Sequence, residues 1–278
     1  MPTKYGLRAH NHLIMTKDQE FFTNGWCTFD LDPELHQWVQ QALPVARKVI
    51  HSEQHAHWLR HDGTWHAGVN ILPNTPQGNI ANSAALGGEA VDFIHEHLSL
   101  GEFDWDRAQV SVCYPGYPKA SADESESAFG YRRKRDAAHI DGLLRAGAER
   151  RRYLREYHGF ILGIPLVEFS EGASPFVVWQ GSHHLARQMF TAILEDHPSS
   201  DWSNLDLTDP YHQLRKQIFD QCKRITISMK PGQAFLVHRL ALHGMAPWQS
   251  AATAGPDGRM ICYFRPQTGS AEDWLFKP

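Results

Sequence analysis

The segment AAHIDGLL, residues 137–144, places His139 and Asp141 two positions apart among apolar neighbours. On a β-strand, residues i and i+2 point to the same face, so we expect both side chains to face one place. Burying an imidazole beside a carboxylate costs free energy unless a partner satisfies the two groups. A metal ion would satisfy both, and another part of the chain would then have to supply a further ligand.

The composition of the whole chain is that of an ordinary globular protein. Its 278 residues suffice for one large domain with a sizeable core. The formal net charge of −4 gives no basic field, so we expect neither nucleic acid nor a membrane surface as a partner. No apolar run in the sequence is long enough to cross a bilayer, and no secretory signal is apparent. The four cysteines form no CxxC pair, which favours the reducing cytoplasm.

The N-terminal third predicts helices. Residues 17–50 have helical character, with Thr16 as an N-cap, Gly25 as a stop, and Asp32 and Pro33 as a second start. Residues 83–99 predict another helix. We therefore expect a helical N-terminal region over about residues 1–105.

The remainder of the chain predicts strands. Six segments are rich in β-branched and aromatic residues and are bounded by turn residues: 108–114, 157–169, 174–180, 224–230, 233–240 and 259–266. Residues 185–222 interrupt them as a mixed, mainly helical insertion. We predict one domain over residues 1–278, mainly β with a helical N-terminal part, whose core of about residues 106–268 forms a barrel or jelly roll.

Two histidines are candidates for the third ligand. The segment PGQAFLVHRLALHGMAPW, residues 231–248, contains His238 and His243. They are five positions apart, so on a regular strand they face opposite sides and only one points inward. Two histidines and one carboxylate that leave open coordination positions are the arrangement of non-haem Fe(II) oxygenases.

Several motifs together resemble the phytanoyl-CoA dioxygenase family of Fe(II)/2-oxoglutarate-dependent oxygenases. HID matches the family's H-x-D, and the other motifs follow the family's order from about residue 17 to 266: FFTNGWCTF (21–29), SPFVVWQGSHH (174–184), PGQAFLVHRLALHGMAP (231–247) and GRMICYFRP (258–266). The resemblance implies a double-stranded β-helix of the jelly-roll or cupin-like type. It also implies Fe(II) as cofactor, and 2-oxoglutarate and O₂ as co-substrates.

The resemblance also implies the site residues. His139, Asp141 and His243 would be the catalytic metal ligands. His243 is preferred to His238 because it is followed by Gly and Pro as in the family, and His238 would be a core histidine. Arg259 would bind the far carboxylate of 2-oxoglutarate, since a guanidinium grips a carboxylate bidentately. Arg265 lies on the same strand with the same parity and is the alternative.

The implied reaction is hydroxylation of an unactivated C–H bond of a small organic molecule, with succinate and CO₂ as co-products. Asp141 disfavours halogenation, since related halogenases lack this carboxylate. Desaturation, epimerisation and ring closure remain open. The rival functions are a cupin-like metal-dependent isomerase or metal-binding protein that does not use 2-oxoglutarate, a non-catalytic binding module, and a zinc hydrolase, although no HExxH motif is present. The sequence predicts neither the substrate nor an oligomeric state.

Of three polar segments, two have two interpretations each. The basic segment YRRKRD (131–136) is a solvated loop or a grip for an anionic substrate. The segment ERRRYLRE (149–156) predicts a surface helix. The segment SADESESA (121–128) predicts a mobile loop, or a lid together with Tyr117. Trp65 is a core aromatic residue or a pocket wall.

Overall fold

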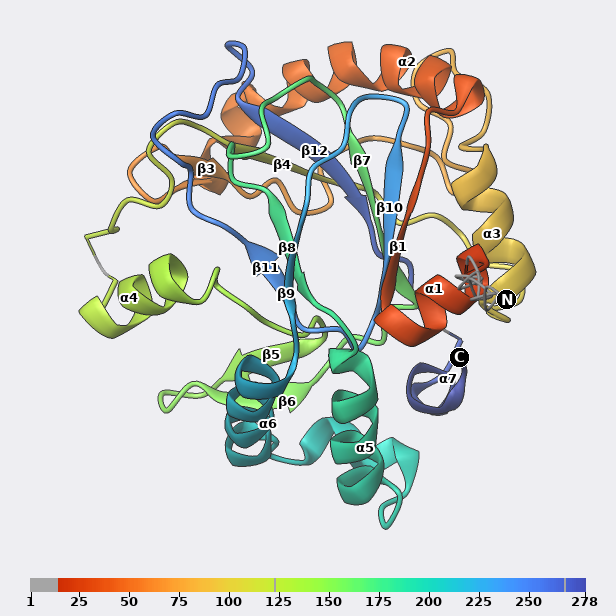
Figure 1. Cartoon of the computed structure of the whole chain (residues 1–278), viewed down its shortest axis with the longest axis vertical. Coiled ribbons are helices and arrows are strands. Elements are labelled where there is room, and N and C mark those ends of the chain that lie inside the picture. The colour runs from red at the N-terminus through yellow and green to blue at the C-terminus, as the bar shows by residue number, and fades with distance from the viewer. Residues whose placement is uncertain (1–14, 123, 268) are drawn as a thin grey trace, which may run out of the picture.

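The computed structural model describes residues 15–278 except residues 123 and 268 (Figure 1). Its α-helices are α1 (Lys17–Asn24), α2 (Pro33–Ile50), α3 (Glu89–His97), α4 (Glu126–Lys134), α5 (Ser182–Leu194), α6 (Thr208–Gln221) and α7 (Ala271–Phe276). Its strands are β1 (Trp26–Phe29), β2 (Leu59–Arg60), β3 (Trp65–His66), β4 (Gln109–Cys113), β5 (Leu143–Ala146), β6 (Arg151–Leu154), β7 (Phe160–Pro165), β8 (Phe176–Trp179), β9 (Arg224–Ile227), β10 (Ala234–His238), β11 (His243–Met245) and β12 (Arg259–Phe264). None of the described helices is long and apolar enough to cross a bilayer.

The strands form two main antiparallel sheets and a separate hairpin. The larger sheet has the order β1-β10-β7-β12-β4-β3-β2, and the smaller sheet has the order β11-β8-β9. Strands β5 and β6 pair only with each other. Figure 1 shows α2 and α3 on the outer side of the larger sheet and α5 and α6 together at one end of the molecule. A fold built mainly from antiparallel strands with additional helices was predicted, and the structure confirms it.

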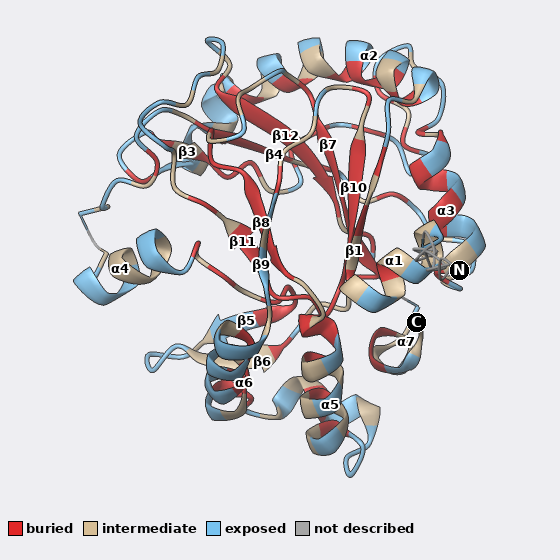
Figure 2. Ribbon diagram, viewed as in Figure 1, coloured by how far each residue is buried: buried red, intermediate tan, exposed pale blue. Residues whose placement is uncertain are grey.

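The outer core lies between the larger sheet and helices α2 and α3. Residues in alternate positions of β12, namely Met260, Cys262 and Phe264, belong to the same buried cluster as Trp38 and Phe93 of the helices. The strand period of two therefore turns every second residue of β12 toward the helices. Each fully buried large apolar side chain of this kind contributes about 1.5–3 kcal/mol. Figure 2 shows the resulting buried strands beneath helices whose outer faces are exposed.

The inner core lies between the two sheets. The other residues of β12, Ile261 and Tyr263, form a buried cluster with Phe176 of β8 and Phe235 of β10. The rings of Phe176 and Phe235 are 4.9 Å apart. Glycine is required at position 163, because a Cβ there would overlap the ring of Phe235. The inner face of the larger sheet thus packs directly on the smaller sheet.

A third buried cluster fixes the segment that carries His139 and Asp141. Ile140 lies between them in sequence and is buried with Leu143, Leu154 and Tyr211 of the β5–β6 hairpin and α6. The backbone N–H of Ile140 donates to the Tyr211 hydroxyl at 3.0 Å. Burial of Ile140 on one side leaves the two flanking side chains directed to the other side.

The six predicted strands are confirmed, and some predicted helical bounds are wrong. Residues 17–50 are not helical throughout, because Gly25 ends α1 with a φ of 79° and the chain continues as β1, which pairs with β10. The predicted N-cap at Thr16 is confirmed, and its N–H donates to the Gln19 side chain at 3.1 Å. The helix expected over 83–99 begins only at Glu89.

The polar segments also differ from expectation. Residues 149–156 contain strand β6 instead of a surface helix, because Leu154 enters the buried cluster while the chain pairs with β5. Most of the basic segment 131–136 is the end of α4 instead of a loop. That helix starts within the segment 121–128, where the Ser125 side chain accepts from the N–H of Ala128 at 3.2 Å.

Candidate metal centre

Two backbone hydrogen bonds hold His139 beside His243. The N–H of His139 donates to the His243 carbonyl at 2.8 Å, and the N–H of His243 donates to the His139 carbonyl at 3.0 Å. The two rings are 4.6 Å apart. This bridge joins the segment 137–144 to β11, so two residues that are distant in sequence are fixed side by side.

Glycine at position 244 permits this close approach. A Cβ on Gly244 would overlap the carbonyl oxygen of Asp136. The next N–H, from Met245, donates to that same oxygen at 2.8 Å. Asp136 itself is held by Arg224 of β9, whose Nε and Nη2 donate to its two carboxylate oxygens at 2.7 and 2.8 Å. The segment leading into His139 is therefore anchored by both backbone and side chain.

The three predicted ligands converge on one point. Oδ1 of Asp141 lies 3.2 Å from Nε2 of His139 and 3.7 Å from Nε2 of His243. Among the described residues, these three offer ligand atoms that all lie within 4.8 Å of one another. A separation of this size suits one metal ion bound by all three atoms.

The second nitrogen of each imidazole fixes the tautomer. Nδ1 of His139 donates to the Ala137 carbonyl at 3.0 Å, and Nδ1 of His243 donates to the Ala241 carbonyl at 3.0 Å. A carbonyl only accepts, so Nδ1 carries the proton in both rings and Nε2 presents its lone pair. Metal-binding histidines are oriented in this way.

The charge states also suit metal binding. Burial alone would raise the pKa of Asp141, but Arg265 and then His243 outweigh that effect and hold its pKa well below the ordinary value. Burial lowers the pKa of His243 to about 4, although Asp141 opposes the shift. At neutral pH the carboxylate is ionised and His243 is neutral, which are the forms that bind metals.

The site is open on one side. The side chain of His139 is 44% exposed, whereas those of His243 and Asp141 are 5% and 9% exposed. The ring of His243 also stacks on Phe176 of the inner core, with centroids 5.5 Å apart. A small molecule would therefore approach the three ligand atoms from the His139 side.

The two candidate arginines, Arg259 at the start of β12 and Arg265 just after its end, have different surroundings. Nη1 of Arg265 lies 3.3 Å from Oδ2 of Asp141, so this guanidinium is already paired with a proposed ligand. Its backbone N–H donates to Asp106 at 2.8 Å, and burial raises the pKa of that carboxyl to about 6. Arg265 thus orients Asp141.

Arg259 is fully buried and has no carboxylate partner among the described residues. Its Nη2 donates to the Tyr263 hydroxyl at 2.9 Å, and its Nη1 lies 3.7 Å from Sδ of Met245. Its Nε is buried without a hydrogen-bond partner. A buried guanidinium with an unsatisfied donor is costly, and a bound carboxylate would satisfy it.

His238 lies in a different cluster, as predicted for a core histidine. Its ring is 4.8 Å from that of His183. Its Nδ1 accepts from the N–H of Leu240 at 3.0 Å, and its Nε2 lies 3.2 Å from Nη2 of Arg187. Neither nitrogen is free to bind a metal. The structure brings together His139, Asp141 and His243 and separates His238 from them.

The sequence analysis missed the residues that support the site. Asp136 and Arg224, which anchor the segment before His139, are 88 positions apart in sequence. Tyr211, whose hydroxyl accepts from Ile140, is 71 positions away. No local pattern indicates such pairs. The only local indication was that Asp136 is an acidic residue within an otherwise basic segment.

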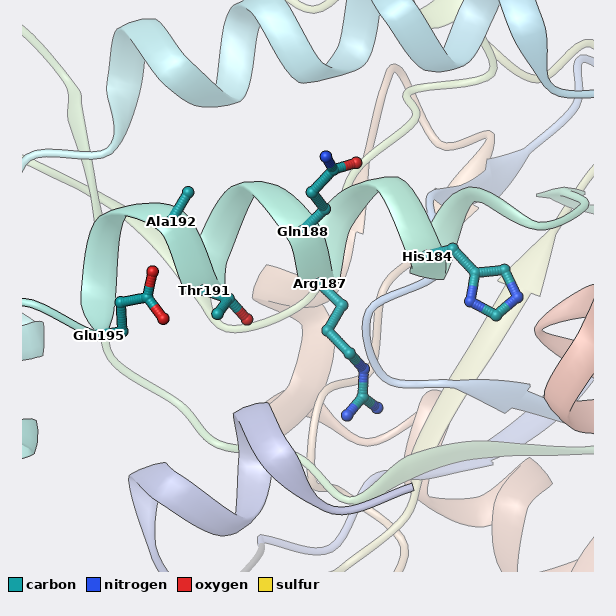
Figure 3. A pocket seen from close by; sticks show the side chains of 6 residues that line it. All are labelled: His184, Arg187, Gln188, Thr191, Ala192 and Glu195. Carbon is teal, nitrogen blue, oxygen red and sulfur yellow. The ribbon is translucent and has the colours of Figure 1, made fainter.

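A hollow of about 460 Å³ lies along α5, away from the proposed ligands (Figure 3). His184 and Glu195 lie at opposite ends of the helix stretch shown there. Arg187 points toward the C-terminal segment, where its Nη2 donates to the Lys277 carbonyl at 2.8 Å. None of the three proposed ligands lines this hollow, so it is not part of the metal centre.

Comparison with known proteins gives neighbours among solved structures only. No family model matches the chain, and no curated protein matches it. The α-ketoglutarate-dependent carbocyclase SnoK from nogalamycin biosynthesis is 13% identical over 95% of this chain and 87% of its own, with a TM-score of 0.48. EctD from S. alaskensis, solved with 2-oxoglutarate and 5-hydroxyectoine, is 13% identical over 94% and 78%, with a TM-score of 0.46. The non-heme monooxygenase ThoJ, solved with nickel, is 13% identical over 91% and 77%, with a TM-score of 0.45.

At these identities and TM-scores, we transfer no activity from those proteins to this chain. Membership of the phytanoyl-CoA dioxygenase family stays a prediction. The case for a function rests on the geometry of the site itself.

Proposed function

We propose that the protein is an Fe(II)- and 2-oxoglutarate-dependent dioxygenase that hydroxylates an unactivated C–H bond of a small organic molecule, with succinate and CO₂ as co-products. One observation carries the proposal. Nε2 of His139, Nε2 of His243 and Oδ1 of Asp141 converge. The buried guanidinium of Arg259, which no carboxylate of the described residues pairs with, lies on the adjoining inner face of β12.

The donor set fits ferrous iron. Two imidazoles and one carboxylate bind three positions of an octahedral ion and leave the others open for exogenous ligands. Bound iron would supply O₂ activation coupled to oxidative decarboxylation of 2-oxoglutarate. His139, Asp141 and His243 would be both the metal ligands and the catalytic residues. Arg265 holds Asp141 ionised and oriented throughout.

Arg259 fits the far carboxylate of the co-substrate. Its fork of donors pairs with a carboxylate bidentately, and its charge persists at any relevant pH. The guanidinium contacts Met245, two residues beyond His243, so a short keto acid is the appropriate length to link the arginine to the metal. The buried rings of Phe176 and Tyr263 exclude water from this end of the site.

We further infer that the chain is a single cytoplasmic domain of the double-stranded β-helix type, related to the phytanoyl-CoA dioxygenases. The facing antiparallel sheets and the order of the sequence motifs support this inference. The substrate is then a small molecule, and neither nucleic acid nor a membrane is a partner.

Turnover of the co-substrate tests the proposal. The purified protein with Fe(II), 2-oxoglutarate and air should form succinate, including slow uncoupled turnover without the prime substrate. Replacing Arg259 with Met should remove a buried charge pair worth about 2–5 kcal/mol, which corresponds to a loss of about 30-fold or more in 2-oxoglutarate affinity. Iron affinity should stay unchanged in this variant. Unaltered 2-oxoglutarate binding in Arg259→Met would instead favour a cupin-like metal protein that does not use the keto acid.

A further inference from the structure

A second cavity, of about 900 Å³, opens among loops and strands that adjoin those of the metal centre. Its walls come from the β2–β3 hairpin, the end of α4 and the β5–β6 hairpin, and they carry Arg60, His61, Trp65, Arg132, Arg145 and Arg150. These elements are distant in sequence, and the fold gathers their arginines around one space.

One wall of this cavity belongs to the sheet that also carries Arg259. Trp65 pairs with Cys113 of β4, and Cys113 pairs with Arg259 of β12 on its other side. The indole N–H of Trp65 donates to the Ser111 hydroxyl at 3.1 Å, and Ser111 lies opposite Ile261 of the inner core. A molecule resting on Trp65 is therefore next to the inner face that holds the proposed co-substrate site.

The opposite wall lies close in sequence to a proposed metal ligand. Arg145 follows Asp141 by four residues, which span at most about 14 Å of extended chain. Between them, Gly142 adopts a φ of 88°, so the true separation is shorter than this limit. A substrate of ordinary metabolite size can reach from Arg145 to the open His139 side of the centre.

The cavity carries an excess of positive charge. Arg132 is paired with Glu124 at 2.8 Å, and the lining residue Asp62 is paired with Lys119 at 3.2 Å. The remaining three arginines of the wall, Arg60, Arg145 and Arg150, have no carboxylate partner among the described residues. Guanidinium groups gathered without acids repel one another, and an anion that binds between them relieves the repulsion.

The titration behaviour of the walls agrees with this charge. Burial and then the neighbouring Arg152 and Arg150 lower the pKa of Arg145. Burial and then Arg132 lower the pKa of His61 to about 4, so His61 is neutral and adds no charge at neutral pH.

An aromatic surface adjoins the arginines. His61 and Trp65 stack with ring centroids 5.7 Å apart and an interplanar angle of 8°. Tyr117 packs edge-on against Trp65, with centroids 6.4 Å apart. The half-buried Trp65 lines the cavity together with the arginines, so apolar surface and donors for an anion adjoin the same space.

We propose that this cavity binds the prime substrate as an organic anion, with its carboxylate or phosphate held by Arg145 and Arg150 and its apolar body lying on Trp65. That the bound anion is the substrate rests on the proposed function, whereas the binding of an anion in this cavity does not depend on it. The bidentate geometry of guanidinium suits both acid groups.

The test uses two aromatic anions, phenyl phosphate and benzoate, with neutral benzyl alcohol as a comparison. Each is titrated calorimetrically into iron-free protein at fixed ionic strength, without 2-oxoglutarate. We expect at least one anion to bind the wild-type protein and benzyl alcohol not to bind. The tighter anion identifies phosphate or carboxylate as the preferred acid.

A matched pair of variants locates the binding. Arg145→Gln/Arg150→Gln removes two charges from the cavity, and Arg133→Gln/Arg155→Gln removes two exposed charges that do not line it. The first variant should weaken anion binding by at least about tenfold, which is about 1.4 kcal/mol, and the second should leave it unchanged. Equal losses in both variants, or no binding of either anion by wild type, would overturn the inference.

Failure of the two proposals is distinguishable. If the proposed function fails, anion binding persists while iron-dependent succinate formation is absent. If the anion site fails, uncoupled succinate formation persists while the cavity variant binds both anions as wild type does.

Discussion

The pairs His139–His243 and His183–His238 differ in their surroundings, and among the described residues only the first has an acid beside it. His139 and His243 present both Nε2 atoms to Asp141. His183 and His238 pack against each other with Arg187 and without a carboxylate. In the first pair Nδ1 donates to a backbone carbonyl, whereas in His238 Nδ1 accepts from the N–H of Leu240 and Nε2 lies against Arg187.

The difference shows that burial does not make a histidine a ligand. Burial lowers the pKa of His238 well below its ordinary value and lowers that of His183 to about 4, so both rings are neutral like that of His243. What separates the pairs is the direction of the lone pairs and the presence of Asp141. The following predictions test this distinction, beginning with the largest effect.

Removing a ligand should abolish turnover. His243→Ala and Asp141→Ala should fold and yet form no iron-dependent succinate above background, because each removes one of three metal ligands. His238→Ala is the matched control and should retain iron-dependent turnover. Succinate assay and circular dichroism of the three variants provide the measurement. Loss of turnover in a folded His238→Ala protein, or full turnover in His243→Ala, would reverse the assignment of the two pairs.

The arginine beside each pair should have different effects on the metal. Arg265→Gln removes the group paired with Asp141 and should weaken Fe(II) binding by about 10- to 100-fold, the range typical of groups that orient metal ligands. Arg187→Gln, beside His238, should leave Fe(II) affinity unchanged. Anaerobic competition with a chromophoric chelator gives both constants. Equal effects of the two variants would mean that Arg265 does not act through Asp141.

The His183–His238 pair should contribute to the free energy of unfolding. His238→Ala leaves the buried N–H of Leu240 without its acceptor, at a cost of about 1–3 kcal/mol. Urea unfolding monitored by fluorescence should show a lower midpoint with an unchanged slope. A midpoint equal to that of wild type would indicate that water replaces the imidazole at this position.

Acid should lower the stability of the protein through His183 of the His183–His238 pair. Burial, with a smaller contribution from His184, lowers the pKa of His183 from 6.5 to about 4. Between these pH values the unfolded chain binds more protons, so the free energy of unfolding falls as pH falls, by at most about 1.4 kcal/mol per pH unit for this residue. His183→Gln should show a shallower pH dependence in urea unfolding over pH 6.5 to 4. An unchanged slope would mean that His183 is protonated in the folded protein.

The sequence predicted the parts of the site that follow local rules. The two-residue spacing predicted that His139 and Asp141 share a face, and they do, although His139 forms an isolated bridge with His243 instead of part of a longer strand. The six core strands were predicted by their β-branched and aromatic composition. The parity argument assumed one strand through His238 and His243, whereas they lie on β10 and β11 of different sheets, so a turn and not strand parity separates them.

The rest depends on contacts between distant residues. Strand β1 is too short to be distinguished from its helical flanks until β10 pairs with it. The basic segment 149–156 becomes a strand only because β5 lies beside it. The pairing of Arg265 with Asp141, 124 positions apart, likewise has no local signal. Arg259 and Arg265 share parity in the predicted strand 259–266, and only their partners distinguish them.

The most direct test is an anaerobic titration of the purified protein with Fe(II) and then 2-oxoglutarate, followed by visible absorption. The account predicts one Fe(II) per chain and a charge-transfer band when the keto acid chelates the iron, both absent in His243→Ala and present in His238→Ala. Iron binding without the band in wild type would contradict the proposed use of 2-oxoglutarate. Iron binding retained in His243→Ala would contradict the site itself.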